Sequence, residues 1–208
     1  SADSSNSLLD LPAGEYTLTV DGSGATLGSF AFRLLDVSTG TVFVPGTPLS
    51  GQLQPARETD IWRFSAGAGD RFFFDIQAAA GGDARWRLLD PFGRTIFGPA
   101  TLTDAGIQEL AWDGVYTLLF EGLSSTGDST SYQFNVQPIT DLTLPLVVGD
   151  TATGTFGHAG QRHLYEVTLA APSRLVFDAL AGVAGLRWSL TGPQGEVVSP
   201  RSFTASDS

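Results

Sequence analysis

The sequence predicts an all-β fold of two antiparallel β-sandwich units, jelly-roll or immunoglobulin-like, each about 100 residues long. The units are circularly out of phase with the chain, which means that the chain begins and ends in the middle of a unit. Three observations predict it. Segments recur along the chain at separations of 100 to 103 residues. The recurring segments alternate apolar and polar side chains with the period of two that marks a half-buried strand. The 25 glycines and 11 prolines suit many short turns.

The repeat starts in the middle of a unit. GEYTLTVDG at residues 14–22 returns as GVYTLLFEG at 114–122, so that Tyr16 matches Tyr116. Further pairs of matching segments are 30–34 with 132–136, 60–64 with 163–167, 71–75 with 174–178, and 85–96 with 187–198. A repeat of this length is domain-sized. We therefore expect a complete unit at 47–142, preceded by a back half unit at 1–46 and followed by a front half unit at 143–208.

Each expected strand rests on alternation between turns. In residues 14–22, Tyr16, Leu18 and Val20 fall on one face and polar residues on the other. The same pattern predicts strands at 30–34, 60–64, 71–77, 85–89, 95–97, 114–122, 132–136, 164–167, 174–179, 187–190 and 196–198. Turns rich in Gly, Asp or Pro separate them at 21–24, 90–93, 125–128 and 192–195. Residues 76–82, with three alanines and two glycines, are expected to form a loop.

Aromatic residues that recur are expected to serve the core. Trp86 and Trp188 stand at the same place in two copies and have same-face neighbours Leu88 and Leu190. The predicted core residues are Tyr16, Phe32, Trp62, Phe74, Trp86, Tyr116, Phe134, Phe177 and Trp188. Trp112 differs from them because Pro12 and Ala13 stand at its place in the first copy. It is the one aromatic residue for which we expect a ligand contact.

Composition excludes several classes of function. The formal net charge of −11 opposes nucleic acid and anionic membranes. No apolar run is long enough to insert into a membrane. Cysteine and lysine are absent, which excludes disulfides, thiol catalysis and Schiff-base chemistry. Methionine is absent as well, and this suggests a part of something longer.

No catalytic or metal site is predicted. His158 and His163 are the only histidines, and their counterparts are Pro55 and Asp60, so the copies share no ligand set. No G-x-S-x-G elbow is present. Calcium stays open as a weakly supported ligand because oxygen-rich turns lie near Asp21, Asp83, Asp128 and Asp150, although no D-x-D-x-D-G pattern occurs. We expect no enzyme and no cofactor.

The front half of the complete unit carries G-x-L, then D-x-W-R-F at 60–64 and R-x-x-F-D at 71–75; the back half carries G-x-Y-T-L and Y-x-F-x-V within 114–136. These motifs resemble the bacterial pre-peptidase C-terminal family of β-sandwich domains. The resemblance covers nearly the whole chain. It implies an accessory, non-catalytic, extracellular domain that in some members adheres to substrates or binds calcium. This chain departs from the calcium-binding members because it lacks a dense acidic cluster.

Half sandwiches expose an apolar face and an unpaired edge, so each half unit needs a complement. Closure can occur within the chain, which we favour because it needs no partner, or between chains, which gives a ring or a fibre. We expect a structural or adhesive repeat module of a large secreted or cell-surface bacterial protein, associating with itself or with neighbouring repeats. The alternative is a carbohydrate- or calcium-binding accessory domain of a secreted enzyme.

Overall fold

The computed structural model describes residues 8–123 and 127–203. The chain divides into two units, the first comprising the residues up to Leu144 with Thr151–Tyr165, and the second comprising Pro145–Asp150 with the residues from Glu166 on. The described residues are strands, turns and extended chain, with one short 3-10 helix, η2 (Val37–Thr39). The prediction of an all-β fold is confirmed. In the part of the chain that the structure describes, no helix has the length and apolar character needed to cross a membrane.

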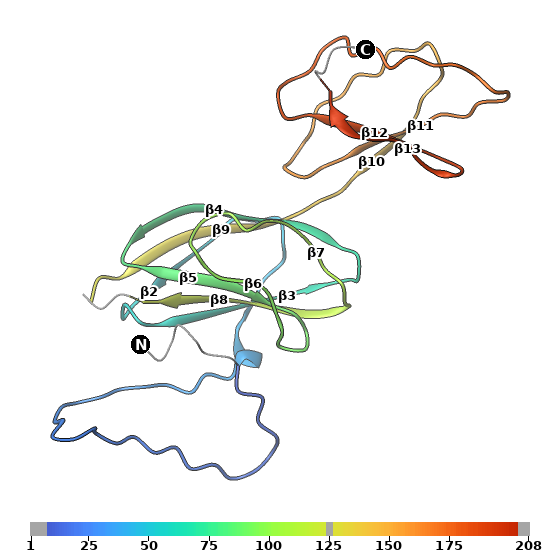
Figure 1. The fold of residues 1–208 in the computed structure, drawn as a ribbon. Coiled ribbons are helices and arrows are strands. Elements are labelled where there is room, and N and C mark those ends of the chain that lie inside the picture. Colours follow the sequence, from blue (N-terminus) through green and yellow to red (C-terminus); the bar gives the residue numbers. More distant parts are fainter. Residues whose placement is uncertain (1–7, 124–126, 204–208) are drawn as a thin grey trace. The chain divides into compact units, whose positions relative to one another are not determined.

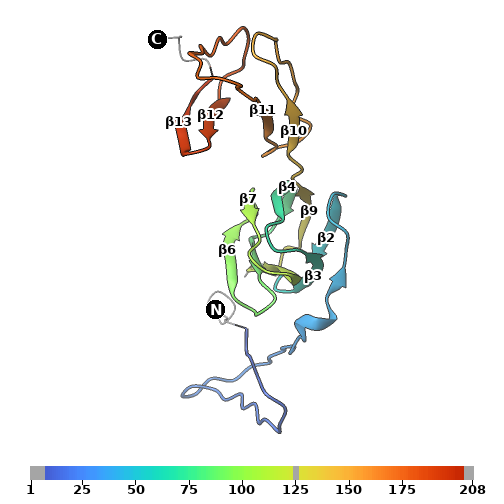
Figure 2. The same ribbon diagram turned by 90° about the vertical axis from the view of Figure 1, so that its right-hand side faces the viewer.

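Nine strands form one complete β-sandwich, which we call the middle sandwich (Figures 1 and 2). Its first sheet has the order β1-β3-β8-β5-β6, and its second has the order β2-β9-β4-β7. The strands are β1 (Thr41–Val42), β2 (Leu49–Leu53), β3 (Thr59–Ala66), β4 (Arg71–Gly81), β5 (Ala84–Leu89), β6 (Thr95–Thr101), β7 (Gly106–Glu109), β8 (Gly114–Gly122) and β9 (Thr130–Pro138). Apart from β1, which runs parallel to β3, the paired strands are antiparallel.

The core of the middle sandwich consists of the inward faces of both sheets. Its largest fully buried side chains include Trp86, Tyr116, Phe64, Phe74 and Phe134. Their rings pack mostly edge to face, for example Phe74 against Trp86 at 6.5 Å between centroids. The alternation of β8 and β9 explains this placement, because every second side chain of each strand points into the same layer. Trp62 is partly buried and packs against this core.

Two expectations about the middle sandwich need correction. Residues 76–82 were expected to form a loop, but β4 continues to Gly81, because β9 pairs with it across a register shift between Ile76 and Ala78. The unit also begins before residue 47. Phe43 is buried in the core, and β1 holds the preceding residues against β3.

The chain on either side of the middle sandwich is only partly ordered into strands. Residues 8–36 contain no strand, and their trace in Figure 1 carries no arrow; the strands expected at 14–22 and 30–34 are therefore not formed. Beyond β9 lie β10 (Leu142–Pro145), β11 (His163–Glu166), β12 (Arg187–Gly192) and β13 (Gly195–Ser202), which pair as β10 with β11 and β12 with β13 (Figure 2). The strand expected at 174–179 is absent. The turn expected at 125–128 lies partly outside the described residues.

Candidate functional site

The residues before and after the middle sandwich form the candidate site, because their apolar side chains are uncovered. We call residues 8–36 the N-terminal segment and residues 142–203 the C-terminal segment. Each matches half of the middle sandwich in sequence, so the middle sandwich shows what each half lacks.

The N-terminal segment keeps the local structure of its counterpart without the sheet. In the middle sandwich, the Tyr116 hydroxyl donates to the Trp112 carbonyl four residues earlier, at 2.7 Å. The Tyr16 hydroxyl donates in the same way to the Pro12 carbonyl at 2.6 Å. Such a tyrosine corner fixes the start of a strand in many β-sandwiches. The N-terminal segment is therefore shaped locally as the beginning of β8 is shaped.

The apolar stripe of this segment faces solvent. Tyr16 is 57% exposed and Phe32 is 56% exposed, whereas their counterparts Tyr116 and Phe134 are fully buried. Tyr16 and Phe32 were expected to lie in a core, and this expectation is wrong for the single chain. Alternation identifies the apolar side of a strand, but the second sheet that would cover this side is not supplied by the segment itself.

The C-terminal segment repeats the start of the middle sandwich. In the middle sandwich the Phe43 N–H donates to the Arg63 carbonyl at 2.9 Å, and in the C-terminal segment the Leu146 N–H donates to the Glu166 carbonyl at 2.8 Å. Leu146 lies 103 residues after Phe43, as does Glu166 after Arg63. The pair β10 and β11 thus corresponds to β1 and β3.

The C-terminal segment also keeps the aromatic pair of the core. The rings of Phe177 and Trp188 stack with centroids 3.9 Å apart, matching the contact of Phe74 with Trp86. Phe203 packs edge-on against Phe177. Phe177 is nevertheless 39% exposed, whereas Phe74 is fully buried. These residues are in contact, as expected of a core, but nothing described within their unit covers them.

One rule accounts for which strands form in the two segments. A strand is present when a partner strand belongs to the same half unit: β10 with β11 corresponds to β1 with β3, and β12 with β13 corresponds to β5 with β6. A strand is missing when all its partners belong to the other half. Residues 14–22, 30–34 and 174–179 correspond to β8, β9 and β4, whose partners in the middle sandwich come from the opposite half. Extended chain without a neighbour leaves its backbone groups to water.

A polar bridge joins the two halves of the middle sandwich. The Tyr132 hydroxyl donates to Asp60 at 2.6 Å and accepts from the Trp62 indole N–H at 2.9 Å. Burial raises the pKa of Asp60, although the phenol that donates to its carboxylate acts in the opposite direction. Burial and the neighbouring carboxylate also raise the pKa of Tyr132 far above its ordinary value. The Tyr132 phenol is therefore neutral and is held between Asp60 and Trp62, two residues of the front half.

The outer segments have lost this bridge as a set. Phe30 stands in place of Tyr132 in the N-terminal segment, and His163 and Tyr165 stand in place of Asp60 and Trp62 in the C-terminal segment. A phenol without an acceptor would leave a buried hydroxyl unpaired, and so would a carboxylate without a donor. The phenol and both of its partners are thus replaced in the outer segments.

A second surface feature lies around Trp112, the residue for which a ligand contact was expected. Trp112 is 47% exposed and packs edge-on against Phe92, which is 63% exposed, with centroids 5.6 Å apart. The Arg94 guanidinium lies 5.0 Å from the Phe92 ring and 5.4 Å from the Trp112 ring. We call these three residues the aromatic cluster. It is absent from the C-terminal segment, where Gln194 and Glu196 stand in place of Phe92 and Arg94.

Asp90 holds the aromatic cluster in place. Its carboxylate accepts from the backbone N–H groups of Phe92 and Arg94, each at 2.9 Å, and pairs with the Arg94 guanidinium at 2.6 Å. Burial acts to raise the pKa of Asp90, but the Arg94 backbone and side-chain donors outweigh it, so that this pKa lies below its usual range. Phe92 and Arg94 were not among the predicted site residues. Their lack of counterparts, the signal that singled out Trp112, could have found them.

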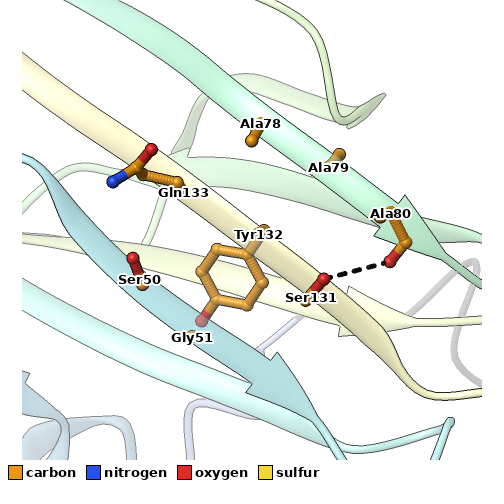
Figure 3. A pocket seen from close by; sticks show the side chains of 8 residues that line it. All are labelled: Ser50, Gly51, Ala78, Ala79, Ala80, Ser131, Tyr132 and Gln133. Atoms are coloured by element: carbon orange, nitrogen blue, oxygen red, sulfur yellow. Dashed lines mark hydrogen bonds between the residues drawn. The ribbon is translucent and has the colours of Figure 1, made fainter.

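A shallow groove of about 280 Å³ lies on the outer face of the sheet formed by β2, β9 and β4 (Figure 3). Its floor is made of small or neutral side chains, and the Ser131 hydroxyl donates to the Ala80 carbonyl at 3.5 Å. The lining residues are Ser50, Gly51, Ala78, Ala79, Ala80, Ser131, Tyr132 and Gln133. No charged side chain lines this groove, and the Tyr132 hydroxyl is engaged with Asp60 and Trp62. The groove therefore offers little beyond shape to a ligand.

The two histidines serve separate contacts. His158 accepts a hydrogen bond from the Thr140 N–H at 3.4 Å, while the His163 ring packs against Phe156 at 4.7 Å. Within the described residues, no group of three or more His, Cys, Asp or Glu side chains is placed to hold a metal ion.

Comparisons with known proteins concern the fold alone. No protein-family model and no curated protein matches the chain. Among solved structures, the chain resembles the periplasmic g-type lysozyme inhibitor PliG of Aeromonas hydrophila, with 15% identity over 48% of this chain and 96% of that chain and a TM-score of 0.34. PliG of Salmonella Typhimurium has 19% identity over 48% and 99%, with a TM-score of 0.36. The pre-peptidase C-terminal domain of a Bacillus anthracis collagenase has 18% identity over 47% and 94%, with a TM-score of 0.36. That domain is of the family that the sequence motifs resemble.

Proposed function

We propose that this chain is a non-catalytic structural repeat module, of bacterial origin and working outside the cytoplasm, whose two half units are completed by complementary half units. The observation that carries the proposal is the pattern of missing strands. Residues 14–22, 30–34 and 174–179 lack strand structure, and their counterparts in the middle sandwich pair across the two halves. The function that follows is assembly of sandwich units into a longer array, with adhesion as a property of the array.

The apolar side chains of the two segments support this proposal. Phe134 touches Phe43, Trp62 and Phe120 in the middle sandwich, and its counterpart Phe32 has only Phe30 as a ring neighbour among the described residues. Burying an aromatic side chain of this size is worth about 1.5–3 kcal/mol. A solvent-exposed stripe of such residues favours an association that buries the stripe.

Amide hydrogen exchange of the 208-residue chain tests the proposal. If the half units are completed, we expect the amides of residues 14–22, 30–34 and 174–179 to exchange on the order of 100-fold or more slowly than in an unstructured chain. Exchange of all three segments at the unstructured rate, at every protein concentration, would contradict the proposal.

Two matched variants give this measurement a control. Phe32→Asp should remove the protection, because it places a charge where the counterpart Phe134 is fully buried. Leu27→Asp makes the same kind of change at a residue that is 96% exposed and whose counterpart, Ser129, lies outside the strands of the middle sandwich. It should leave the protection unchanged. Equal effects of both variants would show that the protection does not arise from completion of the half unit.

The aromatic cluster favours a second candidate function, binding of a neutral glycan. Trp112 and Phe92 are large exposed rings that the repeat does not require, and exposed rings stack on the apolar faces of sugars. A glycan array with wild type, Trp112→Ala and Trp112→Phe tests it. We expect Trp112→Ala to lose binding and Trp112→Phe to retain part of it. The absence of glycans bound by the wild type would exclude this function.

A further inference from the structure

We propose that the N-terminal segment of one chain completes the C-terminal segment of a second copy, so that chains join head to tail through a sandwich built like the middle one. This inference rests on the proposed function, because it specifies which chain supplies each complement. We call the sandwich that would form between two chains the joint. The strand pairs of the middle sandwich give the residue-by-residue register expected in it. Charge, apolar contacts and the length of the connecting chain each support it.

The first charge pair links the strand corresponding to β8 with β12. In the middle sandwich Arg85 lies opposite Glu121 in the ladder of β5 with β8. The residues at these places in the outer segments are Arg187 and Asp21. Both are exposed, and an Arg again faces an acidic residue.

The second charge pair links the strands corresponding to β4 and β9 in the other sheet. Asp75 lies opposite Asn135 in the middle sandwich. Asp178 and Arg33 take these places in the outer segments. A neutral partner of an acidic residue has become a basic partner, so this register places Arg33 opposite Asp178. In the single chain Arg33 pairs with Glu58 at 3.0 Å, and joining would exchange this ion pair for one with Asp178.

The apolar contacts fit the same register. Trp86 lies opposite Phe120, with ring centroids 5.6 Å apart. Their counterparts are Trp188 and Val20, so the joint would place Val20 over the indole of Trp188. Val20 is 48% exposed in the single chain, whereas Phe120 is fully buried.

The ends of the middle sandwich indicate that the complement comes from another chain. The chain reaches the sandwich beside the first half of β3, where Gly40 lies against Ile61. It leaves beside the first residue of β4, where the Ile139 N–H donates to the Arg71 carbonyl at 2.8 Å. The turn at 67–70 joins β3 to β4 at the far end of β3. The two points therefore lie at opposite ends of a sandwich about one eight-residue strand, or about 24 Å, in length.

The connections at these two points are short. Leu35 and Asp36 separate Leu34, the counterpart of Val136, from η2, and residues 139–141 separate β9 from β10. Three residues span at most about 10 Å. A second sandwich built from both segments of one chain would have to meet connections of this length at both ends of the middle sandwich. In head-to-tail joining the two connections lead to two different sandwiches.

Engineered cysteines test the inference directly, because the chain contains no cysteine of its own. Residues opposite each other in an antiparallel ladder are close enough for a disulfide. The variant carrying Arg33→Cys and Asp178→Cys, oxidised under native conditions, should give a ladder of covalent dimers, trimers and higher multiples on a non-reducing gel. The control pairs Arg33→Cys with Glu166→Cys. The counterparts of these two residues, Asn135 and Arg63, lie in different sheets, so the control should give no ladder.

Each other outcome overturns the inference in a recognisable way. A crosslinked single chain without multiples would show closure within one chain, which refutes joining between copies and leaves the proposed function standing. No crosslink beyond the level of the control, together with unprotected amides in 14–22 and 30–34, would refute both. A ladder of equal intensity in the control would show unspecific collision and would also overturn the register.

Discussion

At the scale of single residues, the repeat separates side chains that serve the fold from those that do not. Trp86, which recurs as Trp188, is fully buried in the middle sandwich, while Trp112, which does not recur, is 47% exposed. The sequence could therefore predict the environment of both. It could mark Phe92 and Arg94 as residues without counterparts, but it could not show that they lie beside Trp112. That contact depends on the turn at 90–94 approaching the tyrosine corner of Tyr116.

The core tryptophan gives the first prediction. Trp86→Ala should lower the free energy of unfolding of the middle sandwich by about 3–5 kcal/mol, because the cavity left among Phe74, Phe97 and Phe120 cannot collapse fully. Chemical denaturation measured by tryptophan fluorescence checks it. A change below about 1 kcal/mol would mean that the Trp86 side chain is not a core residue.

The two tyrosine corners give the second prediction. Tyr116→Phe should cost the middle sandwich about 1 kcal/mol, because it removes the hydrogen bond to the Trp112 carbonyl. Tyr16→Phe removes the matching bond to Pro12 and should leave the unfolding of the middle sandwich unchanged while weakening association. Denaturation and sedimentation of both variants check this. An equal loss of stability in both would show that Tyr16 belongs to the middle sandwich.

Asp90 gives the third prediction, on pH. Because its folded pKa lies below the unfolded value of about 4, its stabilising effect is fully present above that value and is lost as the pH falls through the folded pKa. The melting temperature should be flat from neutral pH to about pH 5 and fall in more acidic solution. Asp90→Asn should melt lower at neutral pH and show a shallower acid fall. Identical pH profiles of the two proteins would contradict this role.

At the scale of elements, alternation located most strands of the middle sandwich but neither their partners nor the strands β1, β2 and β7. Residues 60–64, 85–89, 114–122 and 132–136 were predicted as strands and are found within β3, β5, β8 and β9. Residues 14–22 have the same pattern as 114–122 and form no strand. The difference is the neighbour, because β8 pairs on both sides with strands of its own unit.

The remaining errors have a similar cause. The continuation of β4 through Ala78–Ala80 depends on pairing with β9, and β1 depends on lying beside β3. Neither segment alternates strongly enough to indicate a strand by itself. Sequence periodicity reports the face that a strand buries, whereas pairing across a sheet requires the tertiary structure.

An element-scale prediction uses proline. Thr19 corresponds to Leu119, which lies in β8 between β3 and β5. A proline in a central strand removes a ladder hydrogen bond and is not tolerated there. Thr19→Pro should therefore abolish association and leave the unfolding of the middle sandwich unaltered. Association of the variant at wild-type strength, measured by sedimentation velocity, would mean that residues 14–22 never become a strand.

At the scale of the whole molecule, the chain contains one complete sandwich flanked by two segments whose sequences correspond to opposite halves of it. The sequence indicated the out-of-phase repeat, and closure within one chain was favoured from it because such closure needs no partner. The positions at which the chain meets and leaves the middle sandwich, which no sequence pattern reports, favour joining between copies.

The mass in solution, measured by multi-angle light scattering over a wide range of protein concentration, tests this account most directly. Head-to-tail joining predicts an open-ended distribution of multiples of one chain, whose mean grows with concentration and falls to one chain for Phe32→Asp. A mass of one chain at every concentration for the wild type would contradict the account.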